Sequence, residues 1–245
     1  MTYCVGLHLD EGLVLLSDTR TNAGVDHIST FSKMHVLAEP GERVIVMMSA
    51  GNLALTQTVV NLVTEGFDSE SLGEGMTLSS VPTMFKAAQL TGEAIRDVYV
   101  RDGEAMQAQN VPFELSILLA GQIAGRRMRL FQVYSAGNFI EATADTPFLQ
   151  IGEHKYGKPI LDRSVTAETS LSDGVKLALI SMDSTLRSNL TVGLPVDLLV
   201  YRRDSLEVGL QQRLTEENEY FRLIRENWSE ALKSAYKSIP SPPWF

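Results

Sequence analysis

Short apolar segments with a two-residue period, joined by tight turns, recur along this chain. The first two cover residues 2–10 and 13–19, and a Glu-Gly turn separates them. Successive side chains of a strand point to opposite faces, so Val5 and Leu7 should face one way and Cys4 the other. Strands joined by such short turns pair antiparallel. The chain is therefore predicted to build antiparallel sheets from hairpins.

The same pattern returns later and alternates with helical segments. Further strands are predicted at "KMHVLA", "RVIVMMSA", "FELSILLAGQ", "MRLFQVYS", "NFIEAT", "VDLLVYRR" and "LEVGLQQR". A period near 3.6 predicts helices over residues 52–66, 80–101, 170–187 and 215–237. A polar loop is expected at 20–30, where Asn22, Gly24 and Asp26 favour turns.

This order of elements predicts the fold class. Each sheet has two apolar faces to bury, and each amphipathic helix has one. Stacking two antiparallel sheets and placing helices on both outer faces satisfies all of them. We therefore expect an α+β protein, a four-layer α-β-β-α sandwich formed by residues 1–245 as a single domain. The last helix and the tail, at about 215–245, complete it.

Charge and composition exclude several classes of function. The formal net charge is -9, and such an acidic chain repels nucleic acid and anionic membranes. The apolar residues at the N-terminus alternate with polar ones, unlike a signal peptide, and no uncharged apolar run of about 18 residues exists to span a membrane. Cys4 is the single cysteine, so no disulfide forms within the chain. A cytoplasmic location is expected.

Thr2 is the first candidate for a reactive group. A threonine hydroxyl is a weak nucleophile unless a base lies beside it. A free α-amino group on the same residue can be that base, because its ordinary pKa of about 8 leaves a neutral fraction at physiological pH. Met1 precedes Thr2, and an initiator methionine is usually removed before a small side chain. The sequence predicts that the mature chain begins with Thr2, its catalytic nucleophile.

Three further residues fall where such a nucleophile needs them. Asp18 ends the strand that pairs with the first one, and Lys33 opens the third strand, so both should lie near Thr2. The ammonium would lower the pKa of the hydroxyl, and the carboxylate would orient the ammonium. Gly51 ends a strand and precedes a helix, where a backbone N–H can stabilise an oxyanion.

Each of these residues alone has a simpler interpretation. Asp18 could cap a strand end, Lys33 could be a solvated edge charge, and Gly51 could relieve a turn. Cys4 is the rival nucleophile, but no histidine is assured as its partner, which favours a small buried hydrophobe. The four histidines do not have the spacing of metal ligands, and the glycines lack nucleotide-binding patterns, so no metal or cofactor is expected.

Several segments together resemble one family. "TYCVGL", "SDTRTNAG", "FSKM", "SAGNLAL", "IGEHKYGKPILDR" and "DSTLRSNLTVGLPVDLLVY" are similar to the corresponding segments of proteasome-type peptidases, which include proteasome β subunits and the bacterial HslV peptidase. The similarity covers most of the chain and is strongest to the bacterial subfamily called Anbu, the ancestral β subunit. It implies the N-terminal nucleophile hydrolase fold and threonine-dependent cleavage of peptide or related amide bonds.

The resemblance also implies site residues. It implies the same roles for Thr2, Asp18, Lys33 and Gly51 as those given above. It also implies that Asp183 and Ser188 support the threonine amine. Substrate is expected between Ser49 and Leu53, with Arg20, Thr21 and Asn22 offering strand-like pairing. One departure stands out: the family has a serine where this chain has Glu153, in "GEH".

The implied partners are further copies of the chain, in a ring or a spiral, and an ATP-dependent unfoldase is a candidate partner. The alternative function is an assembly subunit with weak or no catalysis, and a small peptide-like amide is an alternative substrate. The terminal "SPPWF" fits a docking segment or a free tail equally well.

Overall fold

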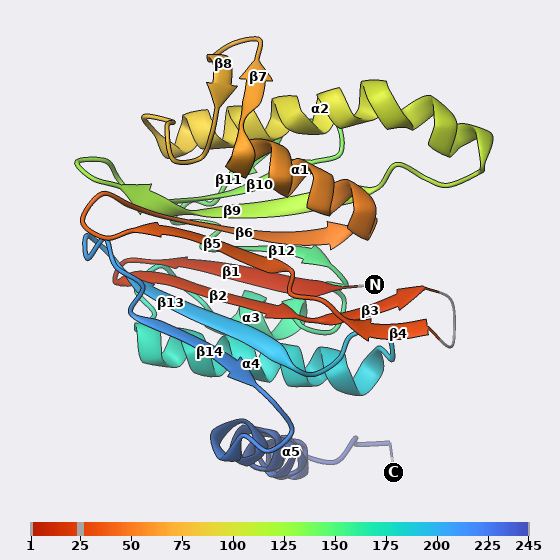
Figure 1. Cartoon of the computed structure of the whole chain (residues 1–245). Helices are drawn as coiled ribbons and strands as arrows, with labels where there is room; N and C mark the ends of the chain where they lie inside the picture. The colour runs from red at the N-terminus through yellow and green to blue at the C-terminus, as the bar shows by residue number, and fades with distance from the viewer. Residues whose placement is uncertain (1, 24–26, 245) are drawn as a thin grey trace.

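The computed structural model describes residues 2–23 and 27–244, and two stacked antiparallel sheets form its centre (Figure 1). The β1 sheet has the order β12 (Phe148–Gly152), β1 (Tyr3–Leu9), β2 (Gly12–Asp18), β13 (Val196–Arg202), β14 (Leu210–Leu214). The β6 sheet has the order β11 (Phe139–Glu141), β10 (Arg129–Tyr134), β9 (Leu115–Ile123), β6 (Arg43–Gly51), β5 (Met34–Glu39). Two predicted hairpins are confirmed: β1 pairs with β2, and β5 pairs with β6.

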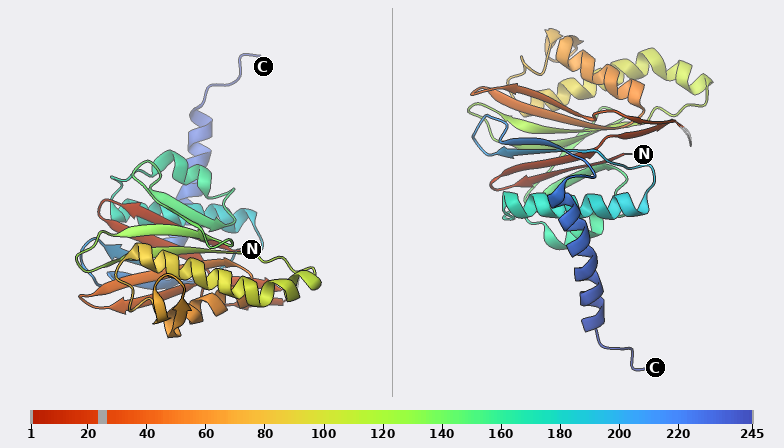
Figure 2. Two further views of the ribbon diagram at one scale, coloured as in Figure 1. Left: turned by 90° about the horizontal axis from the view of Figure 1, so that it is seen from above. Right: turned by 60° about the horizontal axis from the view of Figure 1, so that its bottom comes forward.

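Helices cover the outer face of each sheet, which confirms the four-layer α-β-β-α sandwich. The outer face of the β6 sheet packs against α1 (Leu53–Glu65) and α2 (Met84–Ala108). The outer face of the β1 sheet packs against α3 (Lys158–Ser164) and α4 (Leu171–Ser188). Figure 2 shows that α5 (Glu219–Ser238) crosses α4 and then extends away from the body. Its Phe221 and Ile224 are buried, whereas Leu232 and Tyr236 are exposed.

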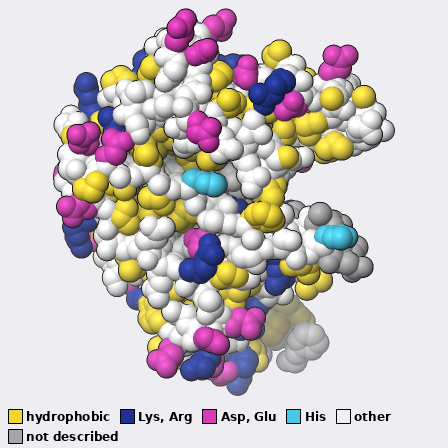
Figure 3. All heavy atoms as spheres, in the orientation of Figure 1, with side chains coloured by type: hydrophobic (Ala, Val, Ile, Leu, Met, Phe, Trp, Pro, Cys, Tyr) yellow, Lys and Arg dark blue, Asp and Glu magenta, His cyan; other side chains and the backbone are white. Residues whose placement is uncertain are grey.

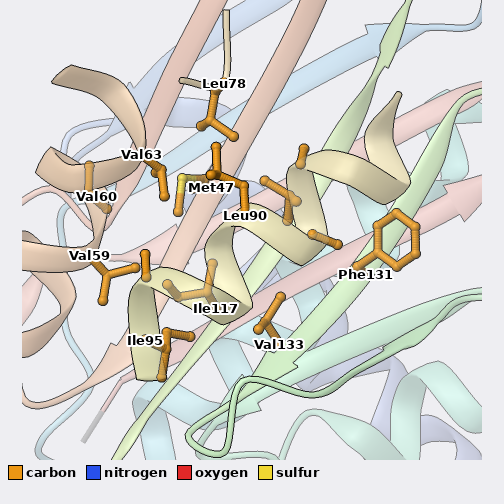
Figure 4. Packing of buried hydrophobic residues seen from close by; sticks show 14 of the residues in the cluster. Met47, Val59, Val60, Val63, Leu78, Leu90, Ile95, Ile117, Phe131 and Val133 are labelled. Carbon is orange, nitrogen blue, oxygen red and sulfur yellow. The ribbon is translucent and has the colours of Figure 1, made fainter. Parts of the chain in front are cut away.

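Three apolar clusters fill the spaces between the four layers. One lies between the β6 sheet and its helices, where Val59 of α1 and Ile95 of α2 meet Ile117 of β9 (Figure 4). A second lies between the β1 sheet and α4, and includes Val5 and Leu7. The third lies between the sheets and includes Cys4. Each large side chain buried here stabilises the fold by roughly 1.5–3 kcal/mol. The two faces predicted for β1 are thus confirmed.

Two small hairpins lie outside the main sheets. The polar loop predicted at 20–30 is instead a hairpin of β3 (Arg20–Ala23) and β4 (His27–Thr30). Both Gly24 and Asp26, predicted as turn formers, lie outside the described residues. A second hairpin pairs β7 (Phe67–Ser69) with β8 (Gly73–Met76). Neither hairpin joins a large sheet, so neither carries the alternation that marks the other strands.

Three of the predicted long helices begin and end close to the predicted residues, whereas α2 continues to Ala108, beyond its predicted end at residue 101. Asn52 caps α1 and accepts hydrogen bonds from two of its first N–H groups. Thr83 caps α2, not Ser80, whose hydroxyl donates to Thr77 in the preceding turn. Within residues 2–23 and 27–244, no helix combines the length and the apolar character that a membrane span requires.

Candidate active site

The start of β1 brings distant segments together at one end of the sandwich, here called the Thr2 end. Cys4 pairs with Ser17 of β2, and Tyr3 pairs with Gly152 of β12. The Tyr3 N–H donates to Asp18 Oδ1 at 3.1 Å. Both neighbours of β1 therefore meet at Thr2, whose residue is 6% exposed. This register puts Asp18 beside Thr2, as the hairpin predicts.

A buried ion pair lies at the same end. Lys33, directly before β5, places its Nζ 2.6 Å from Asp18 Oδ1 and donates to the Arg20 carbonyl oxygen at 2.6 Å. The two side chains are 5% and 0% exposed. Burial raises the pKa of the Asp18 carboxyl group, whereas Lys33 and the N–H groups of Tyr3 and Gly193 oppose this rise. The charged lysine is thus fixed in place with its carboxylate.

Gly51 ends β6 at a position that requires glycine. Its φ is +107°, and a Cβ there would lie 2.3 Å from the Glu114 carbonyl oxygen. Asn52 follows it as the N-cap of α1. The backbone around Gly51 is therefore held at the start of a helix, where N–H groups point outward and favour negative charge.

These groups line one cavity of about 240 Å³. Its walls contain the predicted nucleophile, two of its predicted partners and every predicted substrate-binding residue: Thr2, Lys33, Gly51, Arg20, Thr21, Asn22, Ser49 and Leu53. Asp18 is not part of the walls and reaches the cavity through its ion pair with Lys33. The outline of the molecule is notched between the β3–β4 hairpin and the distal end of α2 (Figures 1 and 3). The structure thus brings together the residues that hairpin geometry predicts.

Two residues of the cavity walls carry unpaired polar atoms. Thr21 Oγ1 and Asn22 Oδ1 are buried and have no hydrogen-bond partner among the described residues. Buried polar groups normally find partners, so this wall is less completely hydrogen-bonded than a protein interior usually is. A larger hollow, of about 470 Å³, lies beside β12 and α3, and one of about 540 Å³ lies around His8 and Arg203. Neither contains Thr2.

Cys4 is fully buried between the sheets. Its Sγ lies 3.8 Å from the Ser49 carbonyl oxygen. Burial raises the pKa of the thiol well above its ordinary value, which disfavours the reactive thiolate. Cys4 therefore behaves as a small core side chain, as its sequence context favours.

The structure does not bring Asp183 to this cavity. On α4, residues two apart differ by about 200° around the axis. Ser181 points to the β1 sheet, with its Oγ 3.0 Å from the Tyr3 hydroxyl oxygen, so Asp183 points away from it. The Asp183 carboxylate instead accepts hydrogen bonds from Arg187 at 3.0 Å and from Arg225 of α5 at 2.8 Å. Its contacts are those of a helix–helix ion pair.

Ser188 also lies apart from the cavity walls. It is the last residue of α4 and is exposed. The next residue, Asn189, is buried and caps the helix through its N–H. Asn189 Nδ2 donates to Glu153 Oε2 at 3.0 Å, and the Glu153 N–H donates to the Thr2 carbonyl oxygen at 2.6 Å. These two residues at the Thr2 end are the ones that the sequence did not assign.

The arrangement supplies the parts of a nucleophilic site. A hydroxyl lies in a cavity with a buried ammonium, which can lower its pKa and stabilise developing negative charge. A carboxylate fixes that ammonium, and Gly51, directly before the N-cap of α1, borders the same cavity at the positive end of the helix dipole. Side chains of this kind act on acyl compounds such as esters and amides without a metal ligand set.

The chain is similar to known proteins in sequence and in structure. The model of the family described as "Proteasome subunit" matches residues 2–200. The search of curated proteins gives no match. Among solved structures, Anbu (ancestral beta-subunit) from Yersinia bercovieri is 50% identical, with a TM-score of 0.89 and 98% of each chain covered.

Two further solved structures are similar over nearly their whole length. The Anbu (Gly-1) mutant from Hyphomicrobium sp. strain MC1 is 49% identical, with a TM-score of 0.90 and 99% of each chain covered. The structure named "Helical Assembly of the Anbu Complex from Pseudomonas aeruginosa" is 49% identical, with a TM-score of 0.91 and 98% of each chain covered.

Proposed function

Because the chain belongs to the proteasome subunit family, we propose that it is a threonine hydrolase that cleaves peptide or related amide bonds. One observation carries the proposal: Thr2, Lys33 and Gly51 line one cavity, and Lys33 is paired with the buried Asp18 at 2.6 Å. The proposal requires that Met1 is removed, so that Thr2 provides both the nucleophilic hydroxyl and a free α-amine.

The reaction proceeds in two acyl-transfer steps. The neutral α-amine of Thr2 takes the proton of the hydroxyl, and Oγ1 attacks the substrate carbonyl carbon. Lys33 and the backbone N–H at Gly51 stabilise the oxyanion. The amine leaving group takes up a proton, and an ester to Thr2 remains. Water then attacks the ester, releases the carboxylic acid and restores the hydroxyl.

The cavity walls indicate how substrate binds. The β3–β4 hairpin places Thr21 and Asn22 at the cavity, where their backbone pairs with an extended substrate as a further strand would. Ser49 and Leu53 flank Gly51 and contact the side chain next to the cleaved bond. A cavity of about 240 Å³ favours a small or medium-sized side chain there.

We also propose that the chain assembles with copies of itself. Its relative from Pseudomonas aeruginosa forms a helical assembly, as its name states. The projecting part of α5 exposes Leu232 and Tyr236, and Ile239 directly after the helix is exposed as well. Such apolar surfaces mark interfaces between proteins. Light scattering after size-exclusion chromatography is expected to give a mass well above the 27.0 kDa of one chain. A monomer would contradict this.

Intact-mass analysis and a peptide-hydrolysis assay test the catalytic proposal. We expect the wild type to lack Met1 and to hydrolyse members of a peptide library, and Thr2→Ala to lose the activity. Thr166→Ala is the matched control, because Thr166 is exposed on the loop between α3 and α4. Hydrolysis that survives in Thr2→Ala would exclude this mechanism, and inactivity of the wild type would favour the assembly-subunit alternative.

A further inference from the structure

Glu153 is a buried carboxylate at the Thr2 end, and the mechanism above does not use it. The residue is 4% exposed. It directly follows β12, and its own N–H donates to the Thr2 carbonyl oxygen at 2.6 Å. The side chain therefore belongs to the residue that holds the backbone of Thr2, whose α-amine the proposed function requires.

The hydrogen bonds of Asn189 fix the orientation of its amide toward this carboxylate. Asn189 Oδ1 accepts from the N–H and the hydroxyl of Thr191, at 2.9 and 2.6 Å. Its Nδ2 group is thus left to donate, and it does so to Glu153 Oε2 at 3.0 Å. The second carboxylate oxygen, Oε1, accepts from the Lys155 N–H at 3.0 Å. Both carboxylate oxygens therefore act as acceptors, and both of their donors are neutral groups.

Gly152 holds Glu153 close to Thr2. Its φ is +80°, and a Cβ at this position would lie 2.0 Å from the Thr2 carbonyl oxygen. Only glycine permits the 2.6 Å hydrogen bond from the Glu153 N–H without displacing Thr2. The Gly152–Glu153 pair is therefore built to hold the backbone of the first strand at its beginning.

A buried carboxylate is stabilised by a nearby cation. Among the described residues, the cation in reach is Lys155, whose Nζ is 4.0 Å from Oε2 and whose side chain is 72% exposed. Such a solvated ammonium compensates a buried charge weakly. The α-ammonium of a chain that begins at Thr2 would arise within the residue that Glu153 already holds.

We propose that Glu153 is the positioning residue for the α-amine of Thr2. This inference rests on the proposed function, because it requires removal of Met1. The Glu153 carboxylate binds the α-ammonium, orients its nitrogen toward the Thr2 hydroxyl and keeps the pKa of the amine high. Asn189 holds the carboxylate in that orientation. The acylation step then depends on pH through the amine that Glu153 controls.

The test measures the pKa of the Thr2 α-amine directly. Chains that intact mass shows to begin at Thr2 are treated with formaldehyde and borohydride over a range of pH, and methylation of the N-terminal peptide is followed by mass spectrometry. In Glu153→Gln we expect the pKa to fall by about one unit, so the amine reacts about ten times faster at neutral pH. An unchanged pH profile would overturn the inference.

Control variants separate this effect from misfolding. Glu168→Gln removes an exposed carboxylate and should leave the profile unchanged. Glu153→Asp keeps the carboxylate on a shorter side chain. The pKa of the Thr2 α-amine in this variant should therefore lie between its values in the wild type and in Glu153→Gln. An α-amine pKa in Glu153→Asp equal to that in Glu153→Gln would overturn the inference.

The outcome is distinguishable from failure of the proposed function. A shift in the amine pKa in a chain that hydrolyses no peptide rejects the function and keeps the role of Glu153. Hydrolysis that requires Thr2, with the same amine pKa in the wild type and Glu153→Gln, rejects the role of Glu153 alone.

Discussion

The two ends of the layer between the sheets both bury polar groups, but they do so differently. At the end opposite Thr2, here called the Gln122 end, Gln122 accepts from the Tyr201 hydroxyl at 2.7 Å and donates to Asp204 at 2.6 Å. It also donates to the Arg126 carbonyl oxygen at 2.7 Å. Every hydrogen-bonding atom of its side chain has a partner.

The Thr2 end lacks this completeness. It buries the charged pair of Asp18 and Lys33, and it holds buried oxygens of Ser17, Thr21 and Asn22 that have no partner among the described residues. A satisfied network rigidifies a fold, whereas partners are left open where a ligand is to bind. The comparison teaches that one end of this layer is fully hydrogen-bonded, as a stabilising network is, whereas the other keeps the open groups that the proposed function uses.

Lys33→Ala should have the largest effect, because it removes the cation of a buried pair. We expect the free energy of unfolding to fall by about 3–5 kcal/mol, since Asp18 would be left uncompensated. Amide hydrolysis should fall by about 10²–10³-fold. Urea unfolding and the peptide assay measure the two effects.

The double variant Asp18→Asn with Lys33→Met is the control for this pair. It removes both charges, so much of the lost stability should return while activity stays absent. Full activity in either variant would break the distinction between the two ends.

Gln122→Ala should affect stability alone. It leaves the Tyr201 hydroxyl and Asp204 without their partner, so the free energy of unfolding should fall by about 2–4 kcal/mol. The rate of hydrolysis per folded chain should not change. Gln211→Ala, at an exposed position of β14, is the matched control. A loss of activity in folded Gln122→Ala would show that the two ends are coupled.

Cys4→Ala should have a smaller effect and sharpens the boundary of the Thr2 end. Removing one buried sulfur atom should cost about 1–2 kcal/mol of unfolding free energy. Activity should survive, because burial raises the pKa of the thiol and holds it protonated. Thermal unfolding and the peptide assay measure both. Inactivity of a folded Cys4→Ala variant would restore the cysteine as the rival nucleophile.

Glu141→Gln, at the Gln122 end, should have the smallest effect. Burial raises the pKa of the Glu141 carboxyl group, but its hydrogen bonds and ion pair with Arg129 outweigh this and lower it below the ordinary value. The pair is partly exposed, so its loss should cost about 1 kcal/mol or less. Arg127, also within reach, is more exposed still.

The sign of its pH dependence follows from the lowered pKa. A carboxyl group with a lowered folded pKa stabilises the fold above its unfolded pKa of about 4.3, and this contribution is lost as the pH falls through the folded value. The difference between wild type and Glu141→Gln should therefore be full at neutral pH and vanish in acid. Urea titrations at several pH values measure it, and a difference that grows in acid would contradict the assignment.

Local pattern was enough to predict the strands joined by short turns and one half of the site, but it missed β12. The alternation in β1 and β2 fixes their pairing, and this pairing alone puts Asp18 beside Tyr3 and Thr2. Lys33 could be predicted because the next strand begins there. The hairpin at β3 and β4 could not, because its β4 residues are exposed throughout and carry no apolar face.

The rest of the site depends on the pairing of distant strands and on which face of a helix a residue occupies. Neither can be read from the local sequence pattern. Glu153 reaches Thr2 through the pairing of β12 with β1, which joins segments about 150 residues apart. Asp183 has the residue type that the family resemblance favours, but helix phase turns it to α5. Asn189 lies one residue beyond Ser188, where the end of α4 turns the chain inward.

The near-complete burial of Thr2 limits the time during protein synthesis in which Met1 could be removed. An aminopeptidase can trim Met1 readily while the emerging chain is still extended. Once β12 has been made and has paired with β1, the first residues are held in a sheet and Thr2 is 6% exposed. At about 5–20 residues per second, the ribosome needs roughly 7–30 s to reach β12. The proposed removal of Met1 would thus compete with translation, and slowing the ribosome should enrich the trimmed chain.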